Sequence, residues 1–509
     1  MRLILSAKIS RQCWIVIIIA VVVALSGWLG ITPKAALPAR NGIVLPADAQ
    51  ASCSVSPSTF AGWFDSGKVS LNGADRPAGS DSFPDGPNCD FYQWSWQMFL
   101  WLTSPTPISR GGGGRHVFHS GVFFNVSALD SSGHRHFIPI DQTPLQQPEE
   151  GHPFIDVNME QGQPQGGEVL MTRTGSLVYY STMVNNVFTY FLTGTSNGNL
   201  QSTHFPINQR ELDPVIAFGR LHGAGFPDSN AFAILVKTSW VEATSLPDPD
   251  NYILMKGTIP TYRIVDSANW VRNGQKTVTL AMVGMHVVGS TAGRPGHPEM
   301  IWATFEHAGN TPNAAYDYVD SNHILVTVPQ NTTGNWLFCD DGAAGSFNEP
   351  HMTFLIDKIE AARGFTISPS NTLRMKPWGS ASDNAASGFP FVNNTEVIAI
   401  NNSIHGLLAS GDVRSHYILI GATWTKDGRP PMGPFSPTGE NELGENELGT
   451  NQLLNSTMET YHQGNRLFRN GFNCFVCHSS GADPDSLTKP GVSHMFETLY
   501  PLFPPGGKQ

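Results

Sequence analysis

The sequence predicts a β-rich α+β fold, in which a large strand-dominated body carries a short helical C-terminal segment. Its 509 residues include 51 glycines and 37 prolines, which would interrupt helices and strands often. Between these breaks, runs of apolar, β-branched and aromatic residues recur, as strands require. The runs are 122–126, 176–184, 232–243, 261–265, 277–289, 300–307, 323–328 and 415–425. The absence of a blade-length sequence repeat argues against a propeller.

Residues 1–49 have the features of an export signal. A basic stretch comes first, followed by an uninterrupted apolar run at 14–25 that continues more weakly to Ile31. A small-residue cleavage site, Ala47-Asp48-Ala49, follows at a long distance for a signal peptide. Two interpretations stay open: a cleaved signal peptide and a soluble periplasmic protein, or an anchor in the cytoplasmic membrane formed by residues 14–31.

The remaining chain divides by composition into four parts. Residues 50–90 are rich in Ser, Gly, Pro and Asp and predict an extended lead-in. Residues 91–426 form the β-rich body, which opens with an aromatic stretch free of Gly and Pro. Residues 427–449 are a Gly/Pro-rich loop that ends in the duplication ENELG ENELG, and residues 450–509 form the C-terminal segment.

Helices are expected in fewer places than strands. The aromatic stretch 91–103 predicts one buried helix, which the following Ser-Pro ends. Residues 351–363 and 450–470 also have helical patterns, whereas 396–408 fits either a helix or a strand.

The C-terminal segment contains the sequence NCFVCHSS at 473–480. Cys474 and Cys477, with two residues between them and His478 directly after, have the spacing that attaches haem c. Two thiols at this spacing reach the two vinyl groups of one porphyrin, and the adjacent histidine becomes the proximal iron ligand. No second CxxC is present for a four-thiolate zinc site, and the βαβ context of a thioredoxin-like pair is missing.

Several residues are candidates for the sixth position of such an iron. His494 is the expected distal ligand, and Met495 and Met458 are alternatives, as are a residue distant in the sequence and a position left open. A histidine would give a low reduction potential and a methionine would raise it. Neighbours on one helix cannot both point at the iron, so His494 and Met495 exclude each other.

Other residues suggest weaker sites. One disulfide can form among Cys53, Cys89 and Cys339, and the sequence does not assign it, although Cys53–Cys89 is one option. On an extended segment, the side chains of His134 and His136 would share a face and could chelate a second metal. Three histidines could act as a distal acid or base over an open iron: His286, His307 and His462. His286 and His307 also fit buried core positions, and Glu306 could be a buried acid.

Charge limits the possible partners. Removing residues 1–49 removes five bases and one acid, which leaves 25 basic and 40 acidic residues and a net charge of −15. This balance argues against binding to nucleic acid and favours a basic-faced redox partner protein. Neither a GxSxG elbow nor an HExxH helix is present, which argues against a hydrolase.

Six segments spread over the chain are similar to segments of a known protein family: 91–102, 280–291, 301–312, 453–463, 473–480 and 493–496. Together they resemble a family of exported bacterial cytochrome c proteins with a single haem motif. The resemblance implies haem at Cys474, Cys477 and His478. It also matches His494 to a histidine after the motif, and Asn455, Thr457, Met458 and Glu459 to the segment before it. The chain departs from the family in the ENELG duplication and at Met495, where a branched aliphatic residue is expected; this favours His494 as the ligand. The resemblance implies no particular reaction.

The leading hypothesis from these residues is a monohaem c-type cytochrome in periplasmic electron transfer. A large body suits a second hypothesis, a haem-dependent peroxidase or oxidase, because a carrier needs fewer residues. A third is a haem-based module that binds a gas or small molecule. Reactivity of the iron with CO, and turnover with peroxide, would distinguish them.

Overall fold

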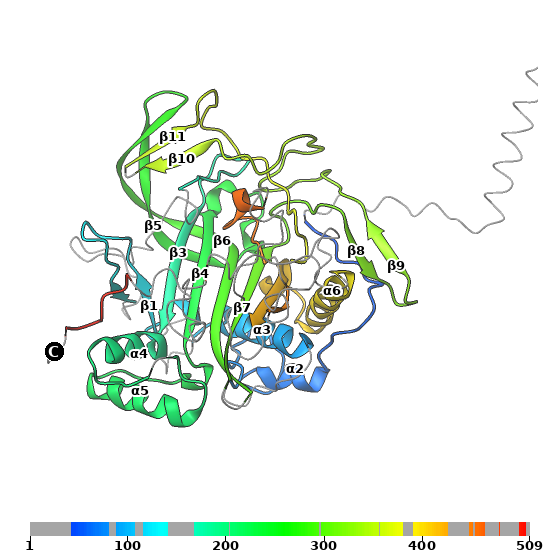
Figure 1. The fold of residues 1–509 in the computed structure, drawn as a ribbon. Coiled ribbons are helices and arrows are strands. Elements are labelled where there is room, and N and C mark those ends of the chain that lie inside the picture. Colours follow the sequence, from blue (N-terminus) through cyan, green and yellow to red (C-terminus); the bar gives the residue numbers. More distant parts are fainter. Residues whose placement is uncertain are drawn as a thin grey trace, which may run out of the picture. The chain divides into compact units, whose positions relative to one another are not determined.

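The computed structural model describes residues 42–80, 88–106, 116–140, 167–202, 204–294, 297–355, 357–379, 390–425, 447–450, 453–463, 478 and 498–504. Asn41–Gln509 form one compact unit. Strands dominate it and helices pack beside them, so the predicted β-rich α+β class is confirmed (Figure 1).

The centre of the fold is an antiparallel sheet (Figure 1). Its main path runs β13-β12-β7-β6-β4-β3-β1-β2. The strands on this path are β1 Phe123–Val126, β2 Phe137–Pro139, β3 Tyr179–Asn185, β4 Ile234–Glu242, β6 Asn269–Arg294, β7 His297–His307, β12 Tyr417–Thr425 and β13 Glu447–Gly449. A separate hairpin joins β8 Tyr316–Val319 to β9 Leu325–Val328.

Strand β6 extends the sheet into an arm (Figure 1). Its second half pairs with β4 and β7, whereas its first half pairs with β5, Leu254–Ile264. The start of β6 also pairs with β11, Lys358–Ala361, which forms a hairpin with β10, Met352–Leu355. The helix predicted at 351–363 is therefore wrong, because Ile359 pairs with Trp270, a partner distant in sequence.

The helices are α2 Pro57–Trp63, α3 Asn88–Thr103, α4 Asn186–Ser196, α5 Gln209–Leu221 and α6 Pro390–Leu407. Short 3₁₀ turns are η2 Val117–His119, η3 Ser229–Ala231, η4 Ala243–Ser245, η5 Pro249–Asn251, η7 Val413–His416 and η9 Thr460–His462. Helix α3 confirms the helix predicted at 91–103, and α6 resolves the ambiguous stretch 396–408. Helices α4 and α5 pack side by side and were not predicted (Figure 1).

Helix α3 is apolar around most of its circumference because it is buried on most sides. It packs on one face of the sheet, where the Phe99 ring stacks on Phe305 of β7 with centroids 4.2 Å apart. A Cβ on Gly289 of β6 would come within 2.7 Å of the Trp94 ring, so the strand needs glycine there for this close contact. This face of the sheet belongs to the main apolar core.

The lead-in is more ordered than predicted. It contains helix α2, whose N-cap Ser56 accepts a hydrogen bond from the Thr59 amide. A disulfide joins Cys53 to Cys89 at the start of α3, which is one of the pairings that the sequence allowed. In the described part of the chain, no helix has both the length and the apolar character needed to cross a membrane. The apolar run 14–31 lies outside that part.

Candidate functional site

Residues 453–463 cover the sheet face opposite α3. The register pairs four residues in one row across β3, β4, β6 and β7: Tyr180, Ser239, Gly284 and Glu306. A Cβ on Gly284 would lie 2.7 Å from the hydroxyl oxygens of both Ser239 and Thr457, so only glycine lets the segment approach β6 this closely. Thr457 itself hydrogen bonds to Ser239 at 2.7 Å, and its carbonyl accepts from the Tyr180 hydroxyl.

This segment is not the regular helix predicted for 450–470. Within the described residues it consists of turns that end in the 3₁₀ turn η9. Four of its polar residues are fully buried: Asn455, Ser456, Thr457 and Thr460. Asn455 donates from Nδ2 to the Thr304 hydroxyl and the Phe305 carbonyl, so side chains, not a helical ladder, hold the segment.

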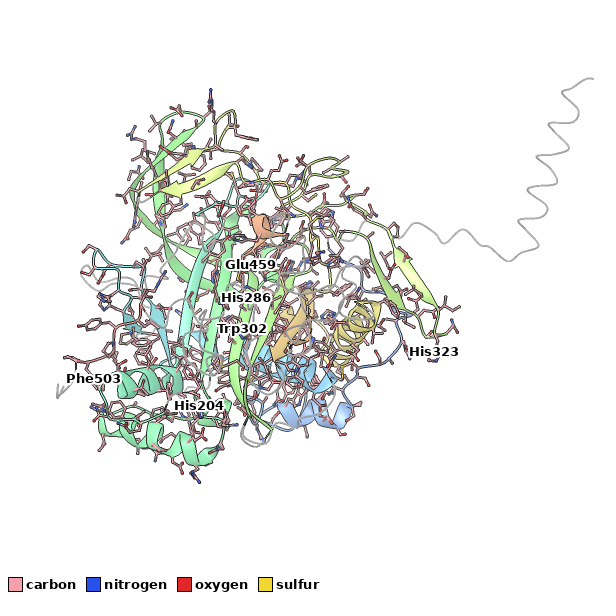
Figure 2. The ribbon with its side chains drawn as sticks, viewed as in Figure 1. His204, His286, Trp302, His323, Glu459 and Phe503 are labelled. Atoms are coloured by element: carbon pink, nitrogen blue, oxygen red, sulfur yellow. A yellow bond between two sulfur atoms is a disulfide. The ribbon has the colours of Figure 1, made fainter. Side chains whose placement is uncertain are left out.

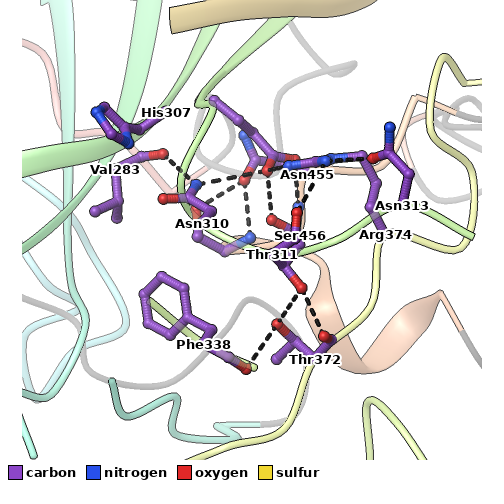
Figure 3. Close-up of polar contacts among 12 residues, drawn as sticks. Val283, His307, Asn310, Thr311, Asn313, Phe338, Thr372, Arg374, Asn455 and Ser456 are labelled. Carbon is purple, nitrogen blue, oxygen red and sulfur yellow. Dashed lines mark hydrogen bonds and ion pairs between the residues drawn. The ribbon is translucent and has the colours of Figure 1, made fainter. Parts of the chain in front are cut away.

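A buried ion pair holds the segment in place (Figure 3). Glu306 and Arg374 are both 0% exposed and form an ion pair. The Glu306 carboxylate also accepts from the Ser456 amide at 2.6 Å and from the Ser456 hydroxyl. Arg374 donates further to the Asn313 side chain at 2.6 Å. The predicted buried acid is thus confirmed at Glu306, with its charge paired and hydrogen bonded as burial requires.

A second charged contact lies one row along the same face. His286 of β6 donates from Nε2 to Glu459 at 2.9 Å, and the other Glu459 oxygen accepts from the Asn455 amide at 3.0 Å (Figure 2). Burial would raise the pKa of Glu459, but the charge and hydrogen bond of His286, with Lys237 nearby, lower it to about 2. Because an ionised carboxylate only accepts hydrogen bonds, Nε2 of His286 carries a hydrogen, and in a neutral ring Nδ1 would be the basic nitrogen.

His478 of the haem motif contacts the next row of residues across the sheet, which contains Val288 of β6 and Trp302 of β7. Its half-buried imidazole packs against Trp302 of β7, with ring centroids 4.7 Å apart and planes inclined at 53°. Trp302 pairs with Val288, and Thr304 pairs with His286, so Trp302 and His286 share one sheet face (Figure 2). The structure thus brings the predicted proximal ligand to the face that carries the His286–Glu459 pair. Cys474, Cys477, His494 and Met495 lie outside the described residues.

Other predicted candidates have structural roles. The Met458 side chain is fully buried in an apolar cluster with Val178, Tyr180 and Phe338. His307 lies on the opposite face from Glu306, stacked on Tyr252 with centroids 3.8 Å apart, and burial lowers its pKa to about 3. It is therefore the buried core histidine that its apolar strand suggested.

The second metal site suggested by His134 and His136 is not supported. His136 instead hydrogen bonds to Asp130 at 2.9 Å, and both imidazoles lie beside the Tyr500 ring. Across the residues that the structure describes, no group of three or more His, Cys, Asp or Glu side chains could hold a metal ion.

Sequence reasoning missed Trp302, Arg374 and Lys237 as parts of this site. Each reaches the site through pairing between distant segments, and the Arg374–Glu306 pair spans 68 positions. One local signal was available: the two-residue alternation of β7 places Trp302, Thr304 and Glu306 on one face, so polar residues recur there within an otherwise apolar strand.

The chain matches no protein-family model, no curated protein and no solved structure with which it was compared.

Proposed function

We propose that this chain is a monohaem c-type cytochrome that transfers electrons in the periplasm. Cys474 and Cys477 would hold one haem c covalently, and His478 would be the proximal iron ligand. One combined observation carries this proposal: the CxxCH spacing, together with the packing of the His478 imidazole on Trp302 at the polar face of the sheet.

The residues present fit haem c. Each cysteine thiol would add across one vinyl group, so that a sulfur–carbon bond forms and the thiol hydrogen passes to the vinyl carbon. The bound haem would supply a one-electron couple, with a histidine nitrogen on its iron. The chain contributes the orientation of that nitrogen, because the Trp302 indole packs on the His478 ring.

His494 remains our proposed distal ligand, 16 positions after His478. With a histidine on each side, the iron would be six-coordinate and its potential low. The chain is acidic, with a formal net charge of −11 over its full length, and this favours encounter with a basic-faced redox partner.

Visible spectra test the proposal. The protein is matured in a host that attaches haem c, and spectra are recorded oxidised, reduced, and reduced with CO. We expect a sharp reduced α-band that CO leaves unchanged. The variant Cys474→Ala/Cys477→Ala should lose covalent haem, whereas Cys339→Ser, which alters a buried free thiol elsewhere, should keep it. Absence of a haem spectrum in the wild type would overturn the proposal.

A haem-dependent peroxidase or oxidase is a second candidate, and one contact favours it. His286 shares a sheet face with Trp302, and Glu459 fixes its ring so that Nδ1 is the basic nitrogen. A histidine oriented by a carboxylate is a suitable general base for peroxide. This candidate predicts a CO-sensitive spectrum and turnover with peroxide. CO binding without turnover would instead indicate a gas-binding module.

The variant His286→Ala separates the two candidates. For an electron carrier, we expect haem content, the α-band and the CO response to stay as in the wild type. For a peroxidase, turnover with peroxide should fall about 100-fold or more while haem stays bound. His136→Ala is the matched control, because His136 also donates to a carboxylate but its side chain is about half exposed and lies elsewhere.

A further inference from the structure

The folded unit includes residues that precede the predicted cleavage site. Residues 42–49 run along its surface and make contacts with three distant segments; we call them the strap. The Ile43 amide donates to the Ala308 carbonyl at 2.9 Å, and the Asn402 side chain of α6 donates to the Pro46 carbonyl at 2.8 Å. Ile43 and Leu45 pack against the main apolar core.

The predicted cleavage site forms backbone hydrogen bonds with the β8–β9 hairpin. Ala49 forms an antiparallel bridge with Asp320, and the Gln50 amide donates to the Val319 carbonyl at 2.9 Å. The Asp48 carbonyl accepts from the Ser321 amide at 2.7 Å. Its carboxylate accepts from the hydroxyl of Tyr318, a residue only 4% exposed, at 2.8 Å.

Cutting after Ala49 would damage these contacts. The Tyr318 hydroxyl and the Asn402 amide would lose their acceptors, and the core beneath Ile43 and Leu45 would lose cover. The Gln50 amide, which donates within the bridge, would become a charged terminus. Tyr318 is buried and Asn402 is partly buried, and each would exchange a fixed acceptor in the protein for water, so a chain cut there would lack part of its own fold.

We infer that the chain is not cut at Ala47-Asp48-Ala49 and that the strap stays attached in the mature protein. The sequence supports this independently, because this site follows the apolar run at a distance that is long for a signal peptide. If the strap is retained, cleavage at Ala47-Asp48-Ala49 does not release the protein from the membrane. Residues 14–31 could then still act as a membrane anchor.

The first test is the N-terminus of the full chain, exported in a bacterial host and recovered from separate membrane and periplasmic fractions. Intact-mass measurement should give an N-terminus at or before Gly42. A start at Met1 or Arg2 in the membrane fraction would also identify 14–31 as a tether. A start at Gln50 would overturn the inference.

The variant Ala47→Lys sharpens this test. The Ala47 side chain is exposed, so lysine fits the fold, but a charged residue is not tolerated at a site that requires small residues. We expect the N-terminus to stay where it is in the wild type. Appearance of a longer product in the variant would show that the peptidase reads Ala47, and the inference would fail.

A second measurement examines the strap without export. Chains that begin at Gly42 and at Gln50 both retain the rest of the compact unit. The chain beginning at Gln50 should melt about 5 °C lower, because it lacks the Ile43 and Leu45 packing and the Tyr318 and Asn402 hydrogen bonds. Equal melting temperatures would show that the strap adds nothing to the fold, which would remove the basis of the inference.

Discussion

Glu306 and Arg374 form an ion pair closed to solvent, and one substitution tests how much the C-terminal segment depends on it. In Glu306→Gln the side chain at position 306 keeps a similar shape, but Arg374 keeps a buried charge without its counter-ion. We expect the free energy of unfolding to fall by about 3 kcal/mol, measured by chemical denaturation. The Ser456 contacts should weaken as well, since a neutral amide is a poorer acceptor than a carboxylate.

The control for this variant is Asp340→Asn. Asp340 also pairs with an arginine, Arg173, at 3.1 Å, but its side chain is 72% exposed. An exposed pair of this kind contributes little, so the free energy of unfolding should change by less than about 1 kcal/mol. Equal losses in Glu306→Gln and Asp340→Asn would contradict the anchoring role of Glu306.

The sequence predicts helices and strands well where burial imposes one pattern. Helix α3 has no Gly or Pro and is apolar on nearly every side, so no strand or loop assignment competes with it. Helix α4 was not predicted because its residues, NVFTYFLTGTS, are largely β-branched or aromatic and suit a strand. The N-cap Asn185 and the packing of these residues favour a helix instead. Helix α5 was not predicted because Pro214 lies inside it, and proline usually ends a helix. Asn208 and Glu211 form a capping pair, which is a sequence signal for the start of this helix.

The candidate site was less predictable than the fold for a related reason. The CxxCH spacing is local and can be read directly, so the haem prediction needs no tertiary information. The partners of His286 and Glu306 are Glu459 and Ser456, more than 100 positions away. Such contacts follow from strand register and from the close approach at Gly284, neither of which a single sequence shows.

The Cys53–Cys89 disulfide connects the lead-in to helix α3 and allows a test at the scale of these elements. It closes a loop between residues 36 positions apart, and such a cross-link restricts the unfolded chain. The variant Cys53→Ser/Cys89→Ser should lose about 3 kcal/mol of unfolding free energy in denaturant titrations. Reductant should shift the wild-type curve by a similar amount and leave the variant unchanged. A wild-type curve insensitive to reductant would argue against the cross-link.

Across the whole molecule, a buried charge cluster joins three segments that are far apart in the sequence. Arg414 donates to Asp75 at 2.6 Å and to Asp412 at 2.7 Å, and also to the Leu100 carbonyl near the end of α3. The cluster therefore connects the lead-in, α3 and the start of β12. One guanidinium faces two carboxylates, so a proton on one of them would balance the charge.

The pH dependence of the free energy of unfolding tests this cluster. Burial raises the pKa of Asp75 from 3.8 to about 7, although Arg414 opposes the shift. Between pH 4 and 7 the folded chain then holds a proton that the unfolded chain has released. The contribution of Asp75 to the free energy of unfolding therefore decreases as pH rises through this window and is constant above it.

The variant Asp75→Asn removes this titration and keeps an oxygen that can accept from Arg414. We expect the melting temperature of the wild type to fall relative to that of the variant between pH 4 and 7, by a few degrees, with the two curves parallel above pH 8. Other acids titrate alike in both proteins and cancel in the difference. Asp340→Asn, which alters an exposed carboxylate, should follow the wild type throughout. Parallel curves for wild type and Asp75→Asn across the whole range would mean that Asp75 stays ionised in the fold, with Arg414 balancing both carboxylates.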